Sequence, residues 1–140
     1  MHQEWLLYPL FAMASLTFYV SVRLLKLRIK AVRNRDLRIS YFRYNRDVEL
    51  PDDLAKTTRH YANLFEFPLL FYIVVIMTYV TQQGDYSHLA LAWAYVISRA
   101  AHAYIHLGSN NILHRKNTFL VSWFILAAIW LKLFLQLMTS

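Results

Sequence analysis

Two apolar segments of the sequence carry ionisable and amide side chains that could do chemistry together. In residues 59–66, Arg59, Asn63 and Glu66 fall within a narrow sector of one helix face, because an α-helix turns about 100° per residue. A second set follows spacings of four, three and four residues on one face, with a further arginine after it: Tyr95, Arg99, His102, His106 and then Arg115. Arginine forks bind carboxylates and a carboxylate binds an ammonium group. The two faces together therefore suit a small zwitterionic peptide.

Other interpretations of these residues remain open. Polar faces of this kind can simply join helices through hydrogen bonds. Two histidines spaced i,i+4, His102 and His106, can bind a metal with Glu66, but the neighbouring arginines would repel a cation, so we expect no metal site. A charge inside a membrane helix costs about 2.5–3.5 kcal/mol, and we therefore expect Glu66 and Arg99, at comparable depth, to form an ion pair.

The composition of the surrounding elements is typical of a membrane protein. Of the 140 residues, 58% are hydrophobic and only 16% are charged, against roughly a quarter in soluble domains. The sequence has no cysteine, which excludes disulfides, thiolate metal sites and cysteine nucleophiles. Residues 119–131 lack the polar stripe that a helix of a soluble bundle would show.

Four apolar segments have about the 20 residues that a helix needs to cross roughly 30 Å of hydrocarbon. We predict an all-α integral membrane protein, a four-transmembrane-helix bundle that forms one domain over residues 1–140. Its expected helices lie at about residues 5–30, 54–82, 87–107 and 117–138. Pro68 should loosen the second helix, because a proline cannot bond to the carbonyl of Leu64.

Positive charge is concentrated between the first two expected spans. The basic connection, about residues 28–58, holds eight Lys and Arg residues, and the turn at 108–116 holds two more. We expect turns at residues 45–47 and 50–53 within this connection. The positive-inside rule places both basic connections in the cytosol and both termini outside it. A basic segment beside apolar spans indicates a membrane flank rather than a nucleic-acid-binding surface.

At these residues the chain resembles the MAPEG superfamily, the membrane-associated proteins in eicosanoid and glutathione metabolism. The run Arg59-x-x-x-Asn63-x-x-Glu66-x-Pro68 resembles the second-helix signature of that family. The third-helix pattern is matched by Arg99-x-x-His102, with His106 and Arg115 following. The likeness covers nearly the whole chain and is nearest to the short bacterial members. It implies a homotrimeric, multi-pass protein of a bacterial inner membrane, with the endoplasmic reticulum as the other location.

The resemblance also implies a function and a role for each site residue. Glutathione, as co-substrate, would bind between subunits near the cytosolic side, held by Arg59, Asn63, Glu66, Arg99, His102 and His106. Arg115 would be the catalytic arginine that stabilises the thiolate for transfer to a lipophilic electrophile or for peroxide reduction. Catalytic members commonly carry tyrosine where His106 stands, and Tyr104 points about 160° away from that position. The alternative is a non-catalytic trimeric membrane module that binds lipid or a partner protein.

Overall fold

The computed structural model describes residues 1–44 and 49–139, and every regular element among them is a helix. The elements in chain order are η1 (Gln3–Leu6), α1 (Leu7–Arg33), α2 (Tyr41–Tyr44), α3 (Asp52–Asn63), α4 (Phe67–Val80), α5 (Tyr86–Leu107) and α6 (Ile112–Thr139). Helix α3 begins at Asp52, two residues before the predicted start at about residue 54, and Pro51 is the residue that precedes its first turn. The turn predicted at residues 45–47, with Arg46 of the basic connection, lies outside the described residues.

Three of the described helical segments are long and apolar enough to cross a membrane: Gln3–Arg33, Asp52–Val80 and Ile112–Thr139. Large apolar side chains cover their outer surfaces, among them Phe18 of α1 and Phe124 of α6, which are 72% and 64% exposed. Such a surface is stable in lipid rather than in water. Helix α5 has 22 residues, but an arginine and three histidines on its buried face reduce its apolar character. The fourth span therefore stays a prediction.

The helix predicted over residues 54–82 is interrupted, and α3 and α4 are separate helices on either side of residues 64–66. Pro68 occupies the first turn of α4, where its missing N–H costs little. Before it, the amides of Leu64, Phe65 and Glu66 donate to carbonyls three residues earlier, so the chain tightens and then stops being α-helical. The predicted loosening at Pro68 is thus a complete break.

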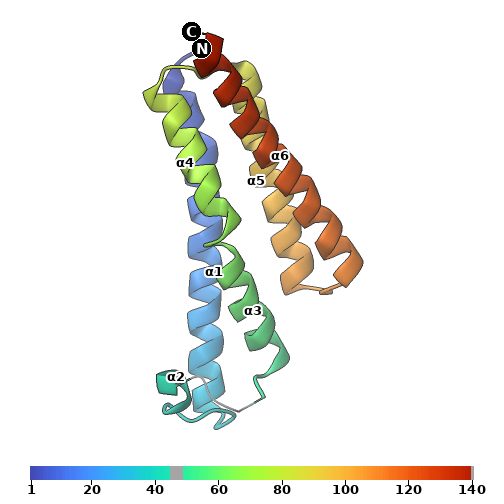
Figure 1. Ribbon diagram of the computed structural model, residues 1–140. Coiled ribbons are helices and arrows are strands. Elements are labelled where there is room, and N and C mark those ends of the chain that lie inside the picture. The colour runs from blue at the N-terminus through green and yellow to red at the C-terminus, as the bar shows by residue number, and fades with distance from the viewer. Residues whose placement is uncertain (45–48, 140) are drawn as a thin grey trace.

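Helix α1 runs the length of the molecule, and α4 and α3 lie along it one after the other (Figure 1). The α5–α6 hairpin packs beside them, with α5 against α1 and α3, and α6 against α4. The main core lies where α1, α4 and α5 meet. There the rings of Phe71 and Tyr95 stack with their centroids 4.4 Å apart, and both side chains are fully buried.

The two termini lie at the same end of the molecule (Figure 1), where a polar network joins three elements. Asp85 caps α5 by accepting a hydrogen bond from the backbone N–H of His88 at 2.8 Å. The other carboxylate oxygen accepts one at 2.7 Å from Nζ of Lys132 in α6. Gln3 donates to the carbonyl of Gly84 at 2.9 Å. Lys132, the lysine in the last span, therefore forms an ion pair with Asp85. The network connects the α4–α5 turn to η1 and to α6.

Candidate functional site

Helices α3 and α5 bring together two of the predicted site residues. Asn63, the last residue of α3, accepts a hydrogen bond through Oδ1 from Nη2 of Arg99, which lies in the second half of α5. The Arg99 side chain is fully buried, yet its Nε and Nη1 have no hydrogen-bond partner. A buried guanidinium with unused donors is costly unless another acceptor reaches it. The guanidinium of Arg99 can therefore donate to a further acceptor, and a carboxylate is the acceptor that suits a guanidinium best.

The ion pair predicted between Glu66 and Arg99 is wrong for the described chain, whose ion pairs all involve Asp85. Glu66 is exposed and lies in the break before α4, past the last turn of α3. Because Glu66 lies beyond the end of α3, the helical spacing that would align it with Asn63 does not apply to it. Arg59, also exposed, lies one turn before Asn63. Both charged side chains are accessible from outside the protomer.

Three histidine rings form a buried cluster beside Arg99. His102 and His106 of α5 were predicted site residues, and their ring centroids lie 5.7 Å apart. His60 of α3 completes the cluster, with its ring centroid 5.8 Å from that of His102 and 5.1 Å from that of His106. His60 is fully buried and neither of its ring nitrogens has a hydrogen-bond partner. Sequence reasoning gave His60 no role, although its spacing of three residues from Asn63 puts both on one helix face.

Three neighbouring histidines are residues that often bind a metal, but the positions of these side chains do not form a metal site. Among residues 1–44 and 49–139, no group of three or more His, Asp or Glu side chains is placed to hold a metal ion. Nδ1 of His102 lies 3.1 Å from the backbone carbonyl oxygen of Arg115, so Nδ1 carries a proton and donates to that carbonyl, while Nε2 has no hydrogen-bond partner. The cluster therefore places imidazole nitrogens that have no hydrogen-bond partner beside the buried guanidinium of Arg99.

Arg115 lies in the first turn of α6, which begins five residues earlier than predicted. Helix α6 starts at Ile112 because the side chain of Asn111 accepts hydrogen bonds from the amides of Leu113 and His114. The Arg115 guanidinium donates to Oδ1 of Asn110 at 2.9 Å, which holds it against the α5–α6 turn. Its backbone carbonyl is the partner of His102, so Arg115 is directly connected to the histidine cluster.

The prediction that Tyr104 points away from the face that carries His106 is confirmed by the exposure of the two side chains. Tyr104 is 83% exposed and His106 only 6% exposed. The two side chains lie on opposite faces of the helix, and only His106 contacts the cluster.

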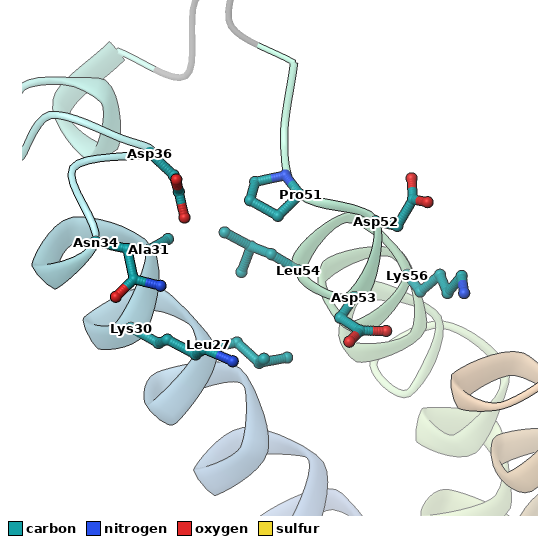
Figure 2. Close-up of a pocket in the computed structure, with 10 residues that line it drawn as sticks. All are labelled: Leu27, Lys30, Ala31, Asn34, Asp36, Pro51, Asp52, Asp53, Leu54 and Lys56. Carbon is teal, nitrogen blue, oxygen red and sulfur yellow. The ribbon is translucent and has the colours of Figure 1, made fainter.

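Two cavities of the protomer are not lined by any of the predicted site residues. An apolar cavity of about 250 Å³ lies between α1 and the α3–α4 break, next to Glu66, and Phe18, Leu64 and Tyr72 are among its lining residues. A polar cavity of about 480 Å³ lies between the end of α1 and the start of α3 (Figure 2). Lysines and aspartates from both helices surround it, including Lys30 and Asp52. None of the predicted site residues lines this second cavity, so it is separate from the site.

Comparison with protein families gives a match that spans nearly the whole chain. The model of the MAPEG family matches residues 6–135, from the last residue of η1 through α1 to α5 and most of α6. Comparisons with curated proteins and with solved structures find no match.

Proposed function

The chain belongs to the MAPEG family, and from this we propose that it is a membrane enzyme that binds glutathione as co-substrate. Members of this family are integral membrane proteins with functions related to glutathione and eicosanoids, and the apolar helices agree with that setting. The proposed activity is that of a glutathione transferase or peroxidase acting on lipophilic electrophiles. The observation that carries the proposal is the buried Arg99 guanidinium, which is fixed by Asn63 and still has two unused donor nitrogens.

The donor set around Arg99 fits a tripeptide with two carboxylates and one ammonium group. Arg99 offers a buried fork for one carboxylate, and Arg59 offers an exposed guanidinium for the other. Glu66 is an acceptor for the ammonium group. Since Arg59 and Glu66 are both exposed in a single protomer, we place the binding site between neighbouring protomers of a homotrimer.

Arg115 is the residue that we assign to the thiol. A guanidinium close to the sulfur favours the thiolate, which is the nucleophilic form, and Asn110 fixes the position of that guanidinium. In the transferase reaction the sulfur forms a bond to an electrophilic carbon, and the leaving group departs with the bonding electrons. We assign proton acceptance from the thiol to His106, because its Nδ1 has no hydrogen-bond partner and it stands in the position where other members carry tyrosine. The apolar cavity beside the break is suited to the lipophilic substrate.

A second candidate function is a non-catalytic trimeric membrane module that binds lipid or a partner protein. The contacts that favour it are Arg99 with Asn63 and Arg115 with Asn110, because both arginines already hold elements of the fold together. On this alternative, Glu66→Gln would disperse the trimer in detergent, and no glutathione binding would be found in the unmodified protein.

The test is a glutathione titration of the purified protein, followed by thermal unfolding and by the ultraviolet absorbance of the thiolate. A ligand that binds only the folded state raises the unfolding temperature. We expect stabilisation and a thiolate signal in the unmodified protein. Arg115→Ala should lose most of the thiolate signal, while Lys116→Ala, which removes an adjacent exposed charge, should keep it. Absence of both stabilisation and thiolate in the unmodified protein would refute the proposal.

A further inference from the structure

A cavity of about 350 Å³ lies between α1 and α5, on a different side of α5 from the histidine cluster. Its apolar walls include Leu16 of α1 and Ala100 and Leu107 of α5. The polar part consists of Tyr19, Arg23 and Tyr104, none of which belongs to the glutathione site proposed above. The cavity thus combines a hydrocarbon surface with one cation and two phenol hydroxyls.

Arg23 is the only charged residue among those that line this cavity. Its Nε lies 3.5 Å from Oγ1 of Thr57, a long contact for a hydrogen bond, and no acidic side chain of the described residues pairs with it. Tyr19 and Tyr104 are 59% and 83% exposed. A half-buried guanidinium with two nearby phenol donors and no acidic group is complementary to an anion.

The polar groups and the apolar walls are ordered along the cavity. Helices α1 and α5 run in the same direction from the end that holds the termini (Figure 1). Arg23 therefore lies toward the last turn of α5, and Leu16, seven residues earlier, lies about 10 Å closer to the bilayer centre at the helical rise. The basic α5–α6 turn is at the same end as Arg23 and is cytosolic by the positive-inside rule. An occupant would have its anionic end at the inner interface and its apolar end in the hydrocarbon.

We propose that this cavity binds a long-chain fatty acid, independently of glutathione. Arg23 holds the carboxylate, with the hydroxyls of Tyr19 and Tyr104 as further donors, and the acyl chain follows Leu16 and Ala100 toward the bilayer centre. One cation beside one apolar surface in a cavity of about 350 Å³ matches one carboxylate with one acyl chain. A phospholipid would bring two acyl chains to a cavity of this volume.

The test measures equilibrium binding of radiolabelled palmitate to the full chain in nanodiscs of uncharged lipid. Arg23→Gln should weaken palmitate binding about tenfold, because a hydrogen-bonded charge pair is lost. Lys26→Gln is the matched control, since it removes an exposed positive charge from the next turn of α1 without touching the cavity, and its affinity should stay within about twofold of the unmodified protein. Hexadecanol, which has the same chain without the acid, should compete poorly.

Three results would overturn the proposal: unchanged affinity in Arg23→Gln, equal competition by hexadecanol, or complete displacement by phosphatidylglycerol, which would assign the cavity to a phospholipid. A photoactivatable palmitate supplies a measurement on the unmodified protein. It should label residues 16–23 and 100–108, and labelling confined to other segments would contradict the site even if Arg23→Gln failed to fold. Because the assay contains no glutathione, its failure is distinguishable from failure of the proposed function.

Discussion

The central residue of the account is Arg99, a fully buried cation whose described partner is an amide rather than a carboxylate. Asn63 accepts from only one of its nitrogens, and two others remain unused. Buried charges in membrane helices are costly and are commonly functional. The same residue therefore supports both the helix contact and the proposed ligand, and the two roles can be separated by substitution.

Asn63→Ala should destabilise the protein by about 1–3 kcal/mol, because it removes the acceptor of a buried guanidinium. Asn117→Ala, at an exposed position of α6, is the control and should change stability by less than about 0.5 kcal/mol. Equilibrium unfolding in detergent measures both. Equal stability of the two variants would show that the contact between α3 and α5 contributes nothing.

His60→Phe separates packing from ligand binding in the histidine cluster. A ring of similar shape without polar atoms removes two buried nitrogens that lack partners, so the free protein should keep or gain stability. If the cluster takes part in the glutathione site, the affinity for glutathione should fall by several-fold in the same variant. Calorimetric titration measures the affinity, and unchanged binding would make His60 a packing residue only.

At the scale of the elements, the break between α3 and α4 determines where the charged side chains go. Asn63 stays on the face that contacts α5, whereas Glu66 is carried to the outside. The spacing in the sequence predicts comparable membrane depths for Glu66 and Arg99, and it leaves the direction of each side chain open. The direction of Glu66 depends on how far Pro68 disrupts the helix, and that is decided by tertiary packing.

Pro68→Ala should extend α3 into α4, because the restored N–H can donate to the carbonyl of Leu64. Hydrogen exchange should slow by about tenfold or more at residues 64–68, and glutathione binding should weaken as Glu66 turns toward the interior. Pro9→Ala, in the first turns of α1, is the control for losing a proline and should leave exchange at the break unchanged. Fast exchange at residues 64–68 in Pro68→Ala would mean that packing alone maintains the break.

The polar network around Asp85 predicts how the stability of the fold changes with pH. Burial acts to raise the pKa of Asp85, but hydrogen bonds from Lys132, the His88 amide and Ser87 outweigh it and hold this pKa well below its ordinary value of 3.8. A carboxylate whose pKa is lower in the folded state stabilises the fold above the unfolded pKa and loses this contribution as the pH falls through the folded value.

The thermal stability advantage of the unmodified protein over Asp85→Asn should therefore be constant at neutral pH and shrink on acidification below about pH 4. Thermal unfolding of both proteins at a series of pH values measures it. A difference that grew toward acid pH would contradict the assigned ion pair. Glu4→Gln serves as a control, since Glu4 has no ion pair among the described residues.

At the scale of the whole molecule, the sequence predicted the helical architecture and the meeting of two polar faces, because both follow from periodicity and from the length needed to cross a bilayer. For that reason, a contact between the face that carries Asn63 and the face that carries Arg99 could be predicted from the sequence. His60 was missed because a histidine near the end of a span is ordinarily an interfacial residue. The Asn110 contact of Arg115 was missed because it depends on the conformation of one short turn, in which Asn110 has a φ of 51°.

The proposed assembly gives a prediction for the molecule as a whole. Native mass spectrometry in detergent should give three times the mass of the 16.7 kDa chain. Glutathione should stabilise this trimer, because the proposed site uses side chains that are exposed in one protomer. A monodisperse monomer that still binds glutathione would place the whole site within a single chain.

The most direct measurement is an experimental structure of the purified assembly in lipid with glutathione added. We expect the tripeptide between two protomers near the cytosolic side, with a carboxylate on Arg99 and with Arg59 and Glu66 facing the ligand. The proposed site would be contradicted by a structure in which Arg59 and Glu66 point toward acyl chains and the protomers share no cavity.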